Sequence, residues 1–224
     1  LAKFFFDEQH FILEKEALFL NSPQPVAFSS EISERNSYLA LDILNFPVVL
    51  TRDHEGTLRA FINACAHRGA KVATGKGKNR RLTCEFHGWS YGMDGKLTGR
   101  PQESCFSSDK SECSLVKLAV SEEYGIILVG LAENMPVSAR DAGFSEIAEE
   151  LTDFKLKDYR FIQRQEYEVA ANWKLINNLS LESYHFATLH RETVAKVLSG
   201  SSIFDTFKRC SRWAFPLLSI ERLE

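Results

Sequence analysis

Cys65-Ala-His67 and Cys84-Glu-Phe-His87 form the most informative pair of motifs in this chain, with sixteen residues between them. Each motif puts one thiol and one imidazole on a tight loop, and glycine-bearing turn sequence follows both, Arg-Gly after the first histidine and Gly-Trp after the second. Two such loops brought together supply two thiolates and two imidazoles, the ligand set of a [2Fe–2S] cluster that has Cys₂ on one iron and His₂ on the other. We therefore predict that Cys65, His67, Cys84 and His87 bind a [2Fe–2S] cluster.

A structural zinc site is the alternative interpretation of these four residues, because Zn²⁺ also accepts Cys₂His₂ ligation. Common zinc modules pair Cys with Cys and His with His, whereas each loop here is mixed. The spacing therefore favours the iron–sulfur cluster.

Length and composition set the class of protein. The chain of 224 residues has room for one large domain or two modest ones, and it is 44% hydrophobic and 25% charged, as is ordinary for a globular protein with a core. Its net charge of -3 provides no global basic field for nucleic acid or an anionic membrane. The longest apolar stretches, such as 125–131, are too short to span a bilayer. We expect a cytoplasmic protein without a signal peptide, whose remaining thiols Cys105, Cys113 and Cys210 are reduced.

The pattern of elements predicts an α+β fold in three parts. Residues 1–35 have helical potential, 36–135 contain strands and many glycines, and 136–224 turn helical again. Within these parts we expect strands over 47–53 and 58–62 joined by a glycine turn, and a hairpin turn at 93–96. The spacing of apolar residues predicts helix over 140–158 and 172–197, and alternation predicts a strand over 159–169.

A second constellation of metal-ligand types lies between Asn172 and His190, where Glu182-Ser-Tyr-His185 is followed five residues later by His190. Two His with a nearby carboxylate suit a mononuclear Fe(II) site that leaves positions open for O₂. On a regular helix, a spacing of five turns the two rings about 140° apart, so we expect a distorted helix or side chains that converge from different directions. Taken alone, two His in a helical stretch are more often ordinary, partly buried residues than metal ligands.

Together the two constellations resemble the catalytic (alpha) subunit of Rieske non-heme iron oxygenases. The first matches the Rieske motif C-x-H-x16-C-x-x-H, the second is similar to the family's N-W-K…E/D-x-Y-H-x4-H, and they occur in the family's order. The resemblance implies a Rieske-type antiparallel β domain at 36–135. It also implies an N-terminal helical segment, 1–35, that packs with the catalytic domain, and at 136–224 the truncated beginning of a helix-grip α+β catalytic domain.

The same resemblance implies roles for individual residues. His185 and His190 match the two His ligands of the catalytic iron, and Asn178 matches an Asn near that iron. Glu182 matches the acidic residue that joins the Rieske domain of one subunit to the catalytic site of its neighbour. The third ligand, a carboxylate far downstream in the family, stays unassigned in this chain.

The implied function is that of an oxidoreductase in a multicomponent system. Electrons from NAD(P)H would arrive through a reductase, with or without a ferredoxin, and pass through the [2Fe–2S] cluster to a mononuclear Fe(II). O₂-derived oxygen would then enter a small organic substrate. We expect an aromatic ring, as in a dioxygenase of aromatic hydrocarbon catabolism, and a homotrimer as the full-length assembly. Two alternatives stay open. One is a monooxygenase of a quaternary amine such as carnitine or choline, because the Glu at position 182 resembles the acid of family members that act on such amines. The other is a Rieske electron carrier without catalysis of its own. We expect the 224-residue stretch alone to be inactive.

Overall fold

The computed structural model describes residues 2–220, and its contacts divide the chain into two compact units. One unit is Glu14–Gln163, and the other joins the residues up to Leu13 with those from Arg164 onward. Within residues 2–220, none of the helices combines the length and the apolar character needed to cross a membrane.

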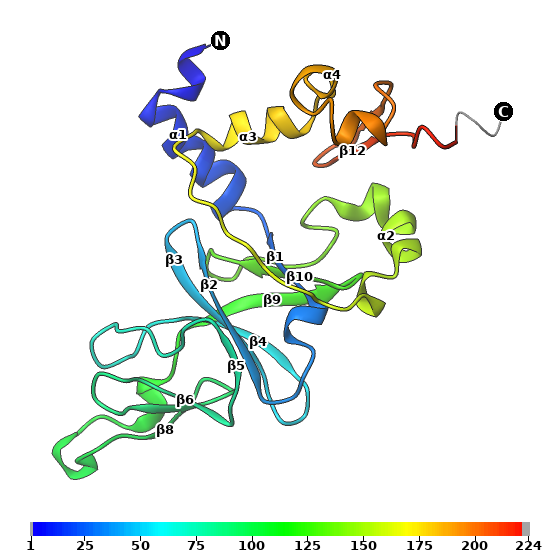
Figure 1. The fold of residues 1–224 in the computed structure, drawn as a ribbon. Coiled ribbons are helices and arrows are strands. Elements are labelled where there is room, and N and C mark those ends of the chain that lie inside the picture. The colour runs from blue at the N-terminus through cyan, green and yellow to red at the C-terminus, as the bar shows by residue number, and fades with distance from the viewer. Residues whose placement is uncertain (1, 221–224) are drawn as a thin grey trace. The chain divides into compact units, whose positions relative to one another are not determined.

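A seven-stranded antiparallel sheet organises the unit Glu14–Gln163 (Figure 1). Successive side chains of a strand point to opposite faces, so the interior strand β3 serves two cores: Val48 and Leu50 pack into one cluster and Val49 into another. The strand order is β1-β10-β9-β4-β3-β2-β5. The bounds are β1 (Gln24–Phe28), β2 (Ser37–Ile43), β3 (Phe46–Arg52), β4 (Leu58–Ile62), β5 (Lys76–Lys78), β9 (Lys117–Glu123) and β10 (Ile126–Gly130).

A three-stranded sheet formed by β6 (Arg81–Thr83), β7 (Ser90–Gly92) and β8 (Leu97–Gly99) carries the second Cys–His loop between its first two strands. The turn between β7 and β8 confirms the hairpin predicted at 93–96. Gly95 in this turn has φ +81°, and a Cβ there would overlap the ring of Phe61, so the position requires glycine. The hydroxyl of Thr51 on β3 donates to the Met93 carbonyl at 2.7 Å and ties the small sheet to the large one.

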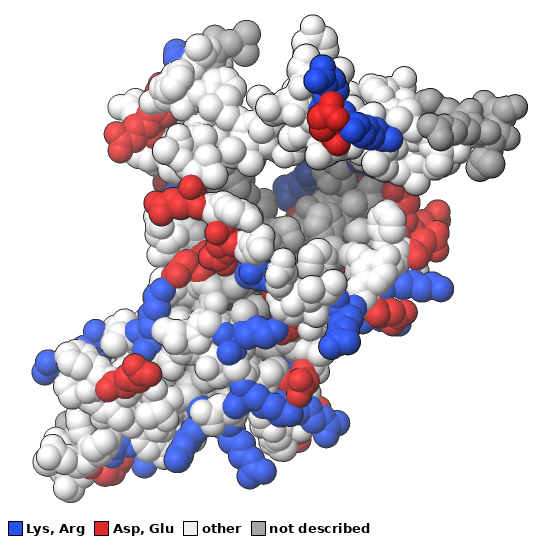
Figure 2. Space-filling model, viewed as in Figure 1, with Lys and Arg blue, Asp and Glu red and all other residues white. Residues whose placement is uncertain are grey.

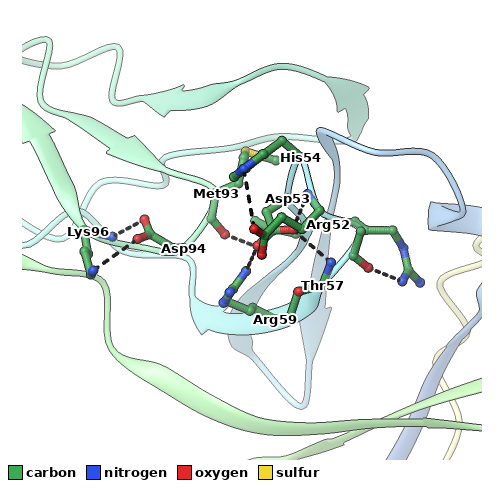
Figure 3. Close-up of polar contacts among 11 residues, drawn as sticks. Arg52, Asp53, His54, Thr57, Arg59, Met93, Asp94 and Lys96 are labelled. Atoms are coloured by element: carbon green, nitrogen blue, oxygen red, sulfur yellow. Dashed lines mark hydrogen bonds and ion pairs between the residues drawn. The ribbon is translucent and has the colours of Figure 1, made fainter.

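The turn between β3 and β4 confirms the other predicted hairpin, and Figure 3 shows the polar contacts that close it. The buried carboxylate of Asp53 accepts hydrogen bonds from the backbone N–H groups of Glu55 and Thr57, both at 2.9 Å, and forms an ion pair with Arg59. Burial alone would raise the pKa of Asp53, but Arg59 and the backbone donors hold that pKa below its usual range.

The first 35 residues are only partly helical, which corrects the prediction for this segment. They contain η1 (Ala2–Phe5), α1 (Glu8–Glu14), η2 (Lys15–Leu20) and η3 (Ser29–Ile32), but β1 lies among them and pairs with β10. A strand whose partner lies about one hundred residues away leaves no local signal. The residues up to Leu13 group with the later unit, where Asn172 Nδ2 donates to the Phe5 carbonyl at 3.2 Å. The domain boundaries at 35 and 135 stay predictions.

The predicted helix over 140–158 is confirmed as η6 (Phe144–Ile147), α2 (Ala148–Phe154) and η7 (Leu156–Asp158), and the α+β class is confirmed with it. The strand predicted over 159–169 is wrong. Its alternation is real, but Ile162 and Tyr167 are exposed and no ladder partner lies beside it among the described residues, so its backbone cannot form a sheet.

The later unit contains short elements and little core. They are α3 (Trp173–Ser180), α4 (Phe186–Leu189), η8 (Val194–Lys196) and a hairpin of β11 (Ile203–Thr206) with β12 (Ser211–Ala214). Among the described residues from Arg164 onward, no apolar side chain is buried. The elements that carry the second constellation are therefore held mainly by local hydrogen bonds and ring contacts.

Candidate metal centres

The two Cys–His loops, residues 65–70 and 84–89, repeat one backbone hydrogen-bond pattern. In each loop the N–H of the first residue donates to the carbonyl of the last at 2.8 Å, and the N–H of the fifth donates back to the carbonyl of the first, at 2.8 Å and 2.9 Å. The fifth residues are Gly69 and Gly88, with φ of +74° and +73°, in the left-handed region that glycine adopts at no steric cost. The glycine after each motif is therefore what lets both loops curl in the same way.

Both predicted cysteine ligands belong to one buried core, and the two predicted histidine ligands lie side by side. The thiols of Cys65 and Cys84 are buried, and the rings of His67 and His87 lie 4.6 Å apart between centroids at 68° to one another. The Nδ1 atom of His67 is buried without a hydrogen-bond partner among the described residues. A buried polar atom without a partner is destabilising unless something binds it, so this nitrogen fits a metal ligand. Two buried thiols and two adjacent imidazoles suit a [2Fe–2S] cluster.

Tyr91, at the centre of β7, makes a polar contact that the sequence did not indicate. Its hydroxyl accepts the N–H of Ala66 at 3.0 Å, so its own proton is free to reach the Cys65 Sγ at 3.1 Å. Burial raises the pKa of Tyr91 above its ordinary value, which keeps the hydroxyl a donor. Tyr91 is more than a packing residue. It belongs to the core and also donates to a cluster ligand, and hydrogen bonds to the sulfurs are one of the factors that set a cluster's potential.

We expect Tyr91→Phe to lower the midpoint potential of the cluster by tens of millivolts, on the order of 100 mV at most, because a donor to an anionic sulfur stabilises the reduced, more negative state. Redox titration followed by EPR measures the shift. Tyr38→Phe is the matched control, since Tyr38 packs against the same buried cluster of side chains. Equal potentials in the Tyr91 variant and its parent would remove the donor role.

The second constellation lies where a helix breaks, as the five-residue spacing predicted. Asn172 caps α3 by accepting the N–H of Lys174 at 3.0 Å, α3 ends at Ser180, and a turn leads into the single-turn helix α4. The break brings the rings of His185 and His190 to 5.2 Å between centroids, at 67°. Both rings can then approach one ion, which a continuous helix would prevent.

Glu182 holds the first of these histidines. One carboxylate oxygen is hydrogen-bonded to His185 Nδ1, and the other accepts the backbone N–H of His185 at 3.3 Å. Burial tends to raise the pKa of Glu182, but the hydrogen bonds from His185 outweigh it and leave the pKa below its usual range. A carboxylate on one ring nitrogen orients the ring and leaves the other nitrogen, Nε2, for a metal.

Other expected members of this site are not brought in. Asn178 is exposed on α3, and within residues 2–220 no hydrogen bond joins its side chain to either histidine ring. Asp205 pairs with Arg212 at 2.9 Å. No three His, Cys, Asp or Glu side chains among residues 2–220 converge as the ligands of a single ion. The residues present therefore offer two neighbouring imidazoles to a metal ion, and the third ligand stays unassigned.

Metal analysis of the 224-residue chain should find two irons per chain, both in the cluster. The four cluster ligands lie on two local loops, whereas two imidazoles alone bind Fe(II) weakly, since Fe(II) stands low in the Irving–Williams order. His190→Ala should leave the iron content unchanged, and Cys84→Ser should remove both irons. A third, tightly held iron would contradict the incomplete ligand set.

Comparisons with known proteins also divide the chain into a first part with the Cys–His loops and a later part with His185 and His190. Residues 22–119 match the family described as the Rieske [2Fe-2S] domain, and residues 156–215 match the catalytic domain of the ring hydroxylating alpha subunit. The chain is 35% identical over 190 residues to the carnitine monooxygenase oxygenase subunit of Acinetobacter baumannii, covering 84% of this chain and 51% of the relative. It is 31% identical over 200 residues to the chloroplastic choline monooxygenase of Beta vulgaris, covering 87% and 44%.

This chain is similar to a solved structure of a quaternary ammonium Rieske monooxygenase. That structure is described in terms of carnitine oxidation by gut microbiota and inter-subunit electron transfer. The TM-score is 0.84 at 30% identity, and the match covers 92% of this chain and 57% of that chain. The chain spans about half the length of the curated relatives it matches.

Proposed function

Because the chain belongs to the family of Rieske non-heme iron oxygenase catalytic (alpha) subunits, we propose that the whole protein is the oxygenase component of a multicomponent monooxygenase for a quaternary amine. It carries a Rieske [2Fe-2S] domain and part of the catalytic domain that binds mononuclear iron in this family. The observation that carries the proposal is that one chain holds both the paired Cys–His loops and the Glu182–His185–His190 group. An electron carrier needs only the first of these.

The choice of substrate class rests on the relatives. Those reported above are named for carnitine and choline. The resemblance noted for a Glu at position 182 favours the same class of substrate. The expected role in aromatic hydrocarbon catabolism is therefore not supported, and a quaternary amine replaces the aromatic ring as the substrate.

Each group of residues has a defined task. When bound, the cluster supplies one-electron transfer and the mononuclear iron supplies oxygen activation. Cys65 and Cys84 would bind the cluster as thiolates, and His67 and His87 would bind it as neutral imidazoles. Glu182 fixes the ring of His185 through Nδ1 and leaves its Nε2 free, so His185 and the neighbouring His190 would hold the mononuclear iron.

The proposed partners follow from this division of work. Electrons come from NAD(P)H through a reductase, with or without a ferredoxin, and a homotrimer places the cluster of one subunit beside the catalytic site of the next. The related structure described in terms of inter-subunit electron transfer supports this arrangement. Lys and Arg side chains gather over the strands of the unit Glu14–Gln163 on the face drawn in Figure 2, which suits an acidic electron donor. Free thiols such as Cys105 support a cytoplasmic location.

Turnover by the full-length protein tests the proposal. Purified protein with a reductase, NADH and Fe(II) is given carnitine, choline or glycine betaine, with naphthalene as the aromatic arm. O₂ uptake and product mass are followed. We expect substrate-dependent O₂ consumption with one of the amines and none with naphthalene. Reduction of the cluster without oxygen incorporation in any arm would favour the electron carrier, and a colourless, zinc-loaded protein would remove the Rieske assignment.

A further inference from the structure

The ring of His67 is oriented by other rings rather than by a hydrogen bond. Trp89 stacks on it at 5.0 Å between centroids with only 8° between the planes, and Phe106 meets it edge-on at 6.4 Å. Among the described residues, no hydrogen bond to either nitrogen of this ring is found, and its Nδ1 is buried. A histidine that binds a metal is usually fixed through its second nitrogen by a carboxylate or carbonyl. At His67 ring stacking takes that place.

Part of this stack belongs to a loop with little regular structure. Phe106, which also meets Trp89 edge-on at 5.4 Å, lies between the short turns η4 (Glu103–Cys105) and η5 (Lys110–Cys113). A loop of this kind has few backbone hydrogen bonds to hold it closed. Something else must keep the Phe106 ring against the histidine.

Arg100 supplies that hold. Its side chain is only 2% exposed, and its guanidinium contacts residues on both sides of Phe106 in the sequence. Nη2 donates to the Ser108 carbonyl at 2.7 Å, Nη1 donates to the Ser108 hydroxyl at 3.1 Å, and Nε donates to Glu103 at 3.1 Å. The same group lies 4.4 Å from the Phe106 ring centroid and 5.5 Å from that of Trp89. The planar fork of arginine suits this set of contacts, and a lysine ammonium could not reproduce it.

We propose that Arg100 is a positioning residue for the cluster: it clamps the loop 101–114 so that Phe106 and Trp89 hold the His67 ring in its ligating orientation. The proposal rests on the assignment of His67 as a Rieske ligand. Pro101, the next residue, contacts the second ligand loop as well, since a Cβ on Gly88 would lie 3.2 Å from its Cγ. The clamp therefore acts at the junction of both loops.

Two variants separate position from charge. Arg100→Met removes the fork and the charge, whereas Arg100→Lys keeps the charge and loses the fork. If position matters, both variants change the nitrogen coupling of one of the two histidines in pulsed EPR of the reduced cluster, and Phe106→Leu gives a similar change. Lys117→Met is the matched control, because it removes an exposed charge from β9, just after the loop.

Two native thiols report whether the loop opens. Cys113 lies 3.9 Å from Arg100 Nη1 and packs against the core, whereas Cys105 is exposed. In cluster-loaded full-length protein, peptide mass spectrometry should show that Cys113 reacts with a thiol reagent about tenfold faster in both Arg100 variants, as expected from lost charge-assisted hydrogen bonds. The rate for Cys105 should not change.

The outcomes are distinct. Parent-like coupling and thiol rates in Arg100→Lys, with changes in Arg100→Met alone, would show an effect of charge and overturn the clamp. Parent-like values in both would also overturn it, while leaving the Rieske assignment intact. A parent protein without any cluster would overturn the proposed function and the clamp together. If Arg100→Met does not fold, Arg100→Lys and Phe106→Leu carry the test.

Discussion

Replacing Glu182 by Gln in the full-length protein should leave the cluster and the catalytic iron in place, yet lower product formation about 10- to 100-fold. The carboxylate is bound to His185 Nδ1 and has no other side-chain partner among the described residues, although it is partly exposed. It can therefore orient a ligand of one centre and still meet a group of another subunit. Gln keeps the shape and removes the charge that stabilises both contacts. Iron content, cluster reducibility and product yield are the measurements.

Glu192→Gln is the matched control for this prediction. Glu192 is an exposed acid that follows His190 by two residues and pairs with Lys196 at 2.6 Å. Its loss should leave turnover near the parent value, since exposed ion pairs contribute little. Near-normal turnover in a metal-replete Glu182→Gln protein would refute the proposed link between the two centres.

The cluster loops could be predicted from the sequence because their geometry is local. The four ligands lie within 23 residues, and each loop closes through its own backbone and a glycine. Tyr91 could not be found in this way. Its contact with Cys65 joins the middle of β7 to the first Cys–His loop across 26 residues, and nothing near a tyrosine in a strand distinguishes a donor to sulfur from a packing residue.

The same difference between local and distant contacts explains which strands could be predicted from the sequence. The hairpins at 47–62 and 93–96 carry their own turn residues, so their pairing follows from nearby sequence. β1 and the stretch 159–169 show the reverse, because a strand exists only where a distant partner completes its ladder. At the second site, the spacing of His185 and His190 predicted the break in the helix, whereas the exposed position of Asn178 depends on where α3 begins and ends.

The largest electronic effect is expected at the cluster itself. His67→Cys or His87→Cys should lower the midpoint potential by several hundred millivolts, judging from about −150 to +300 mV for Rieske centres and about −400 mV for all-thiolate ferredoxins. A thiolate adds a negative charge where an imidazole was neutral, so the oxidised cluster is stabilised relative to the reduced one. Redox titration of the reconstituted variants measures the shift.

The effect should be confined to the two ligand histidines, which makes His54→Cys the appropriate control. His54 lies on the β3–β4 turn with its side chain 80% exposed, so a new thiol there changes the cysteine count without reaching the cluster (Figure 3). Its potential should equal that of the parent. A cluster-loaded His67→Cys protein that also keeps the parent potential would show that His67 is not a ligand. The stacked rings of Trp89 and Phe106 would then have to be explained by packing alone, because the reason to fix the orientation of His67 would be gone.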